Sequence, residues 1–190
     1  MFLRLILLSF ISFNAAASSS DLGFTDRPEY GLVWNEIGRH YDIDPILLYS
    51  IALTESGIEI EHGRISPWPF TFRAHDARYY ADDMDEAVET LKMFVEKYGD
   101  RVDVGMGQIN LKWHAHRVNE KAQLLDPATN LSVMAQILKE TMASTEDTHL
   151  GIGRYHSWTE DRARWYAGKV LKIYFNLASM ENNNATKSNP

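Results

Sequence analysis

The sequence DPILLYSIALTESG, residues 44–57, predicts a short helix with a clear start and end. Asp44 supplies a capping oxygen, and Pro45 fits the first helical position because no hydrogen bond is needed from its nitrogen there. Gly57 is typical of a helix end. Positions spaced by three or four residues share one face of such a helix. On this face lie Leu48, Ile51, Ala52 and Glu55.

Glu55 is the one acidic residue on this otherwise apolar face. A carboxyl that loses hydration is harder to ionise, so its pKa rises. Such a group keeps a proton near neutral pH and can donate it to a leaving oxygen. Glu55 is therefore a candidate general acid. The other interpretation is that Glu55 lies at the helix end with its carboxyl reaching water.

The N-terminus has the pattern of an export signal. A basic start ending at Arg4 precedes an apolar run over 5–13, and Ala15 to Ala17 resemble a cleavage site. The apolar run is too short to span a bilayer as a helix. We therefore expect a signal peptide over 1–17, a polar lead-in over 18–29, export to the periplasm and no stable membrane anchor after cleavage.

Composition excludes several classes of protein. The 190 residues include no cysteine, so disulfides, thiolate metal sites and lipid attachment through an N-terminal cysteine are excluded. The formal net charge of −7 makes the chain a poor binder of polyphosphates, so no nucleic acid partner is expected.

The remaining pattern predicts a mainly α-helical domain over 30–178 and a disordered tail over 179–190. Further helices are expected over 30–41, from Asp83 or Asp85 to Gly99, over 111–119, after Asp126-Pro127 and after Thr159. The buried face predicted for the helix after Thr159 consists of Ala163, Tyr166, Val170, Tyr174 and Leu177. The sequence between 151 and 158 is punctuated by glycines and ends in aromatic residues. About six helices should surround a cleft.

Residues 58–83 interrupt the helical pattern and predict a small β-hairpin at the edge of the cleft. The segment is unusually rich in aromatic residues: Trp68, Phe70, Phe72, Tyr79 and Tyr80. Two interpretations are open for this group. The rings either pack the hairpin onto the helices, or one or two of them line a sugar-binding groove.

A glycine-rich stretch over 103–110, DVGMGQIN, predicts a turn that presents two amide side chains, Gln108 and Asn110. Asn130, in the first turns of the helix after Asp126-Pro127, lies where it can reach back to a loop. His114 and His116 are two residues apart, so they cannot chelate a metal as an i, i+4 pair does. No metal site is predicted.

Four motifs occur in a recognisable order: ALTESG at 52–57, DVGMGQIN at 103–110, LLDPATNL at 124–131 and GRYHSW at 153–158. Together they resemble the lytic transglycosylases of the SLT domain type, whose fold is related to goose-type lysozymes. The sequences SPWPFTF and NLKWH resemble the subgroup found with conjugation, type IV secretion or pilus systems. The resemblance covers roughly 30–178 and implies a single lysozyme-like domain.

The resemblance implies a role for individual residues. Glu55 matches the single catalytic acid/base of the family, and Ser56 matches the serine that follows it. The resemblance implies six substrate-binding residues: Ser56, Gln108, Asn110, Tyr155, Asn130 and His156. Gln108 and Asn110 match amides that contact sugar N-acetyl groups, Tyr155 matches the tyrosine that hydrogen-bonds close to the catalytic carboxyl, and Asn130 matches an asparagine that supports the site. Two positions depart from the family pattern, Gly107 where methionine is common and His156 where asparagine is usual.

The reaction implied is cleavage of the β-1,4 bond between N-acetylmuramic acid and N-acetylglucosamine in peptidoglycan strands, with 1,6-anhydromuramoyl ends and no cofactor. Two other carboxylates, Glu59 and Asp103, leave a second reading open. A second acid facing the anomeric carbon would favour lysozyme-like hydrolysis. A third reading is a non-catalytic peptidoglycan-binding component of a secretion apparatus.

Overall fold

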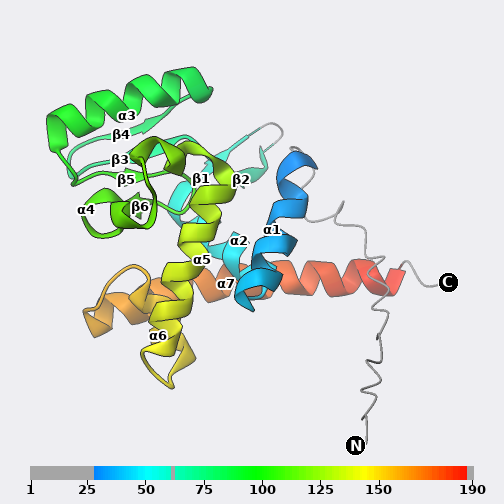
Figure 1. Cartoon of the computed structure of the whole chain (residues 1–190). Coiled ribbons are helices and arrows are strands. Elements are labelled where there is room, and N and C mark those ends of the chain that lie inside the picture. The colour runs from blue at the N-terminus through cyan, green and yellow to red at the C-terminus, as the bar shows by residue number, and fades with distance from the viewer. Residues whose placement is uncertain (1–27, 61–62, 188–190) are drawn as a thin grey trace, which may run out of the picture.

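The computed structural model of the chain describes residues 28–60 and 63–187, which form a mainly helical fold with a small amount of antiparallel sheet (Figure 1). The predicted signal peptide lies outside the described residues. None of the helices within the described ranges combines the length and the apolar character needed to cross a bilayer.

Five helices build the lower part of the molecule in Figure 1. They are α1 (Pro28–Tyr41), α2 (Pro45–Ser56), α5 (Pro127–Ala143), α6 (Thr148–Arg154) and α7 (Glu160–Lys187). The long helix α7 packs against both α2 and α6, and α5 packs against α1 and α6. The helix that carries Glu55 is thus held between the N-terminal and C-terminal helices of the chain.

A four-stranded antiparallel sheet with order β4-β3-β5-β6 forms the upper part, next to helix α3 (Met84–Tyr98). Its strands are β3 (Thr71–Arg73), β4 (Arg78–Tyr80), β5 (Asp103–Val104) and β6 (Ile109–Asn110). A separate pair joins β1 (Gly57–Glu59) to β2 (Ile65–Pro67). Short helical turns follow the sheet: α4 (Leu111–His114), η4 (Ala115–Arg117) and η5 (Lys121–Leu125).

The sheet is larger than the single hairpin expected from the sequence. The β3–β4 hairpin is present, but β3 also pairs with β5, which places Phe72 opposite Val104. The stretch 103–110 is therefore two strands joined by a turn, not a turn alone. Strands of two or three residues are too short to show an alternating pattern, and the β3–β5 pairing joins residues far apart in the chain.

Aspartate caps start the helices where the sequence predicted them. The Asp44 carboxylate accepts from the Ile46 nitrogen at 2.8 Å, and Asp126 accepts from the Thr129 nitrogen at 2.8 Å. Of the two candidates for the third helix, Asp83 is the cap, because its carboxylate accepts from the Glu86 nitrogen. Local capping thus fixes the register of the three helices.

One hydrophobic core joins the helical part to the sheet. Its largest fully buried side chains include Leu48 and Ile51 of α2, Phe72 of β3, and Met134 and Leu138 of α5. The apolar face predicted for residues 44–57 is buried as expected. Because α2 and β3 share this core, the Glu55 end of α2 is fixed relative to the sheet.

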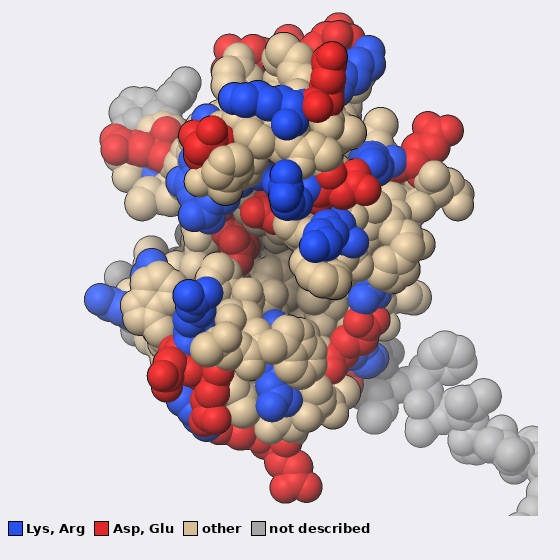
Figure 2. All heavy atoms as spheres, turned by 90° about the vertical axis from the view of Figure 1, so that its left-hand side faces the viewer, with Lys and Arg blue, Asp and Glu red and all other residues tan. Residues whose placement is uncertain are grey.

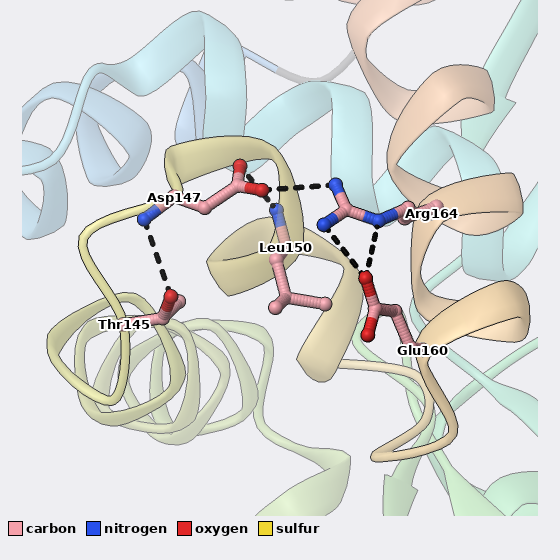
Figure 3. A network of polar contacts seen from close by, with 5 residues as sticks. All are labelled: Thr145, Asp147, Leu150, Glu160 and Arg164. Carbon is pink, nitrogen blue, oxygen red and sulfur yellow. Dashed lines mark hydrogen bonds and ion pairs between the residues drawn. The ribbon is translucent and has the colours of Figure 1, made fainter.

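Helix α6 was not predicted, because two glycines in seven residues disfavour a helix in isolation. Asp147 caps it by accepting from the Leu150 nitrogen, and the same carboxylate pairs with Arg164 of α7 at 2.9 Å (Figure 3). Arg164 also binds Glu160 at 2.8 Å. This network fixes α6 against α7, and thereby positions the connecting residues 155–159.

Helix α7 continues to Lys187, so the expectation of a disordered tail from 179 was wrong for residues 179–187. The asparagine-rich end has weak helix propensity. However, adding residues to the end of an existing helix requires no new nucleation step. Residues of weak helix propensity can therefore remain helical at the end of a long helix.

Candidate active site

A cleft of about 810 Å³ lies between the sheet part and the helical part. Figure 2 shows this face hollowed between its upper and lower halves, with acidic atoms inside the hollow and basic side chains around it. Glu55 lines the cleft, together with Asp103 from β5 and His156 from the link between α6 and α7. Residues from both halves of the chain thus meet in one cavity.

Glu55 lies in the last turn of α2 and lines this cleft. The pKa of the carboxyl is raised from its ordinary value of 4.5 to about 7, chiefly because the group is buried and in smaller part because of the nearby charge of Asp103. A hydrogen bond from Tyr166 and the charges of Arg73 and Arg78 lower the pKa in part. Near neutral pH, the carboxyl is therefore present in both its protonated and its ionised form, as a group that alternates between acid and base requires.

Tyr166 of α7 is the direct partner of Glu55. Its hydroxyl donates to Glu55 Oε1 at 2.6 Å, and burial raises the pKa of this phenol well above its ordinary value, so it remains a donor. Among the described residues, Glu55 Oε2 takes part in no hydrogen bond, which leaves that oxygen to exchange a proton with a ligand. The sequence placed Tyr166 on the buried face of its helix but gave no sign of this contact.

Tyr155, which the family resemblance implied as the partner of the catalytic carboxyl, makes a different contact. Its hydroxyl donates to the carbonyl oxygen of Gly107 at 2.6 Å, and its ring stacks near Tyr166 with centroids 6.4 Å apart. Tyr155 lines the cleft. Tyr155 therefore holds the glycine-rich turn against the link between α6 and α7, whereas Tyr166 is the tyrosine that hydrogen-bonds to Glu55.

Ser56 and Asn130 hold the turn between β5 and β6 and do not line the cleft, and for Asn130 this confirms the predicted reach back to a loop. The Ser56 hydroxyl contacts the Met106 carbonyl oxygen at 2.9 Å, and Asn130 Oδ1 accepts from the Gly107 nitrogen at 2.9 Å. Asn130 Nδ2 also donates to the carbonyl oxygens of Val104 and Leu124. Ser56 and Asn130 are both 1% exposed and lie outside the cleft lining.

The turn itself needs its glycines. Gly105 has a φ of 78°, and a Cβ there would collide with Asn130 Nδ2. Gly107, flagged for its departure from the family pattern, faces inward: a Cβ would lie 3.1 Å from both Asn130 Oδ1 and the Met134 side chain. The departure at Gly107 thus allows close packing on α5 and does not open the cleft.

Gln108 and Asn110 line the cleft, as predicted, and both present an oxygen. Gln108 Nε2 donates to the carbonyl oxygens of Gly105 and Thr71, and Asn110 Nδ2 donates to Asp103 Oδ1 at 2.7 Å. The two side-chain oxygens, Gln108 Oε1 and Asn110 Oδ1, are buried without a hydrogen-bond partner. Gln108 also has a φ of 47°, an uncommon backbone conformation for this residue type. The pair is therefore oriented to accept hydrogen bonds from a ligand.

The two additional carboxylates have different environments. Glu59 is exposed on β1 and lies outside the cleft lining, because Gly57 ends the helix before Glu59 can align with Glu55. Asp103 lines the cleft, and burial raises the pKa of its carboxyl while the hydrogen bond from Asn110 lowers it. Asp103 is thus the lining acid whose charge acts on Glu55, whereas Glu140, which also lines the cleft, is paired with Arg117 at 2.6 Å.

His156 lines the cleft and lies flat on Tyr166. The two rings are 4.8 Å apart and inclined by only 4°. Burial lowers the pKa of His156, and the charge of Arg73 lowers it further. Asparagine is usual at position 156 in the family that the sequence resembles. This chain instead has a histidine ring there, which stacks on Tyr166, the hydrogen-bond partner of Glu55.

The aromatic residues between 68 and 80 do not form a sugar-binding wall in this cleft. Phe70 and Phe72 are buried in the core, the Trp68 indole nitrogen donates to the Ala81 carbonyl oxygen at 2.7 Å, and Tyr79 contacts Glu86. Arg73 is the residue of this segment that lines the cleft. The packing interpretation is therefore confirmed for Trp68, Phe70 and Phe72, whereas Tyr79 is exposed outside the cleft lining.

The site combines two acids of raised pKa, Glu55 and Asp103, with a tyrosine that binds one oxygen of Glu55 and two unpaired amide acceptors. Such a set can transfer a proton to a bound oxygen and receive one back. Comparisons with models of protein families, with curated proteins and with solved structures gave no match.

Proposed function

We propose that the chain cleaves glycan strands of peptidoglycan as a lytic transglycosylase of lysozyme-like fold, with Glu55 as its catalytic acid and base. The observation that carries the proposal is the environment of this carboxyl: a pKa of about 7, a cleft-facing position and a hydrogen bond from Tyr166. Protonated Glu55 donates through Oε2 to the glycosidic oxygen between N-acetylmuramic acid and N-acetylglucosamine, and the C–O bond breaks.

The remaining steps need no second protein carboxylate. The acetamido oxygen of the substrate stabilises the positive charge at the anomeric carbon, and Gln108 Oε1 and Asn110 Oδ1 accept hydrogen bonds from acetamido N–H or hydroxyl groups. Ionised Glu55 then takes the proton from the C6 hydroxyl. The C6 oxygen bonds to the anomeric carbon, which closes a 1,6-anhydro ring, and no water is consumed.

Hydrolysis by two acids is the second candidate, and Asp103 is the observation that favours it. Asp103 lines the same cleft and its charge acts on Glu55. Its Oδ1 is, however, bound by the amide of Asn110, which stabilises Asp103 as part of the cleft wall. We therefore rank the lyase reaction first.

The proposed setting is the periplasm, where local opening of the wall serves a conjugation, type IV secretion or pilus apparatus. This part of the proposal depends on the signal-like N-terminus and on the resemblance of SPWPFTF and NLKWH to that subgroup. A non-catalytic peptidoglycan-binding role is the alternative for the same setting.

The test is digestion of purified sacculi by the parent protein, by Glu55→Gln and by Glu59→Gln. Mass spectrometry of the released muropeptides should detect anhydromuramoyl ends with the parent and with Glu59→Gln, whose carboxyl lies outside the cleft. Glu55→Gln should lose at least about 100-fold in rate. Reducing ends alone would support hydrolysis, and an inactive parent would support the non-catalytic role.

A further inference from the structure

The cleft extends beyond the surroundings of Glu55 along the second half of α5. Asn130 holds the turn beside the catalytic carboxyl, whereas Ile137 and Thr141 line the cleft further along the same helix. The cavity of about 810 Å³ is in the size range of pockets that enclose a whole ligand, so it can contact more than the one bond that is cleaved.

Two tryptophans line this extension. Trp113 belongs to α4, and Trp158 belongs to the link before α7; they are 64% and 69% exposed. Figure 1 places α4 and the start of α7 on the same side of the molecule, one above the other. Exposing two large apolar rings to water is unfavourable, so a ligand that buries their surface gains binding free energy. The C–H faces of pyranose rings match such flat apolar surfaces.

A cation lies close to each ring. Lys112 Nζ is 4.8 Å from the centre of the Trp113 ring, and Arg154 Cζ is 5.0 Å from that of Trp158. Cation–π contacts of this kind restrict the orientation of a ring. Rings that are ordered before binding lose less conformational freedom when a ligand arrives.

Arg154 provides an independent sign of a missing ligand. Its Nη1 donates to the carbonyl oxygen and to the hydroxyl of Ser144 at 2.9 and 2.7 Å, but its Nε is buried with no acceptor. A buried donor of a charged group without a partner is costly. Because Arg154 lines the cleft, an acceptor on a ligand can satisfy this N–H.

We propose that the surface formed by Trp113, Ile137, Thr141, Arg154 and Trp158, here called the aromatic arm, binds a β-1,4-linked N-acetylhexosamine chain next to the bond that is cleaved. The two tryptophans stack on sugar rings, and Arg154 Nε–H donates to an acetamido carbonyl oxygen. This inference rests on the proposed function, since it identifies the ligand as a glycan.

The test uses Glu55→Gln protein, which should bind without turnover, and the hexamer of N-acetylglucosamine as the probe. Trp113→Ala and Trp158→Ala, each made in this background, should raise the Kd measured by calorimetry at least about tenfold. Trp165→Ala is the matched control: Trp165 is 60% exposed and lies under Lys169 at 4.2 Å, but it is outside the cleft lining. Its Kd should be unchanged.

A second measurement detects binding at the tryptophans themselves, in Glu55→Gln protein that keeps all of them. The chain has five tryptophans, so the nitrogen-15 spectrum of the Glu55→Gln protein should resolve their indole N–H signals, assigned by single substitution. Adding the hexamer should shift the signals of Trp113 and Trp158 and leave that of Trp165 in place. Unshifted signals of the two cleft tryptophans, or no saturable binding of the hexamer, would overturn the inference.

The two proposals fail separately. One outcome is that sacculi are cleaved in a Glu55-dependent way while the Kd for the hexamer is unchanged in Trp113→Ala and Trp158→Ala. This outcome would refute the aromatic arm but support the proposed enzyme activity. Sacculi left intact, with hexamer binding lost in both tryptophan variants, would refute the enzyme and support the arm as a glycan-binding groove.

Discussion

The Tyr166 hydroxyl binds Glu55 Oε1 at 2.6 Å across 111 positions of sequence. This bond joins the last turn of α2 to the second turn of α7, two helices that pack against each other. It stabilises the ionised carboxylate and therefore opposes the effect of burial on the pKa of Glu55. The acid of the site is thus tuned by a helix from the other end of the chain.

Tyr166→Phe should raise the pKa of Glu55 above about 7, because it removes the hydrogen bond that lowers it. The alkaline limb of the pH–rate profile for sacculus clearing should move to higher pH, and the maximal rate should fall about tenfold through loss of positioning. Tyr155→Phe is the control, since its hydroxyl binds the Gly107 carbonyl oxygen. An alkaline limb that stays in place in Tyr166→Phe would contradict this account.

The ionisation of Glu55 should make the folded protein less stable as pH rises. The folded pKa is raised from 4.5 to about 7, so the contribution of this group to stability is fully present below pH 4.5 and is lost as pH rises through 7. The total loss is at most about 3 kcal/mol. In urea unfolding at pH 8, Glu55→Gln should therefore be more stable than the parent, whereas at pH 4 the two should be close. Equal stability at both pH values would show that the carboxyl is not desolvated.

Asp103→Asn should shift the pKa of Glu55 in the opposite direction from Tyr166→Phe. The negative charge of Asp103 raises the pKa of Glu55, so its removal lowers that pKa and moves the alkaline limb to lower pH. The amide oxygen still accepts from Asn110, and anhydromuramoyl ends should remain the main product within about tenfold of the parental rate. Complete loss of turnover would make Asp103 a catalytic acid and favour hydrolysis.

Two glycines of the C-terminal half should respond to alanine with opposite signs. A Cβ at Gly153 would collide with the backbone of Ala163, so Gly153→Ala should separate α6 from α7 and destabilise the fold by about 2 kcal/mol or more. At Gly168, in α7, a Cβ meets no atom within 4 Å, and Gly168→Ala should stabilise by about 0.8 kcal/mol. Thermal unfolding of both variants checks the pair; a neutral Gly153→Ala would contradict the observed α6–α7 packing.

Features that depend on neighbouring residues were predictable from the sequence. Asp44 and Asp126 cap the helices that follow them, Gly57 ends α2, and Glu55 shares the face of Ile51 and Ala52. Capping and helical periodicity act within a few residues, so the pattern contains the information. The exposure of Gln108 and Asn110 to the cleft was also predictable, because the glycines next to them indicate a turn.

Features that depend on distant contacts were not predictable. The sequence placed Tyr166 on a buried face without its partner and directed attention to the aromatic segment near Phe72. Whether an aromatic ring is buried or lines a cleft is decided by which elements pack around it. Trp113 and Trp158 line the cleft because α4 and the α6–α7 link meet there, and no local pattern distinguishes them from core residues.

The position of Tyr166 in the last helix has a consequence for the timing of activity. A polypeptide still emerging from the ribosome contains Glu55 long before the tyrosine that binds it has been synthesised, and α2 then has no α7 to pack against. The carboxyl therefore acquires its hydrogen-bond partner, and the environment that sets its pKa, only once α7 has folded onto α2.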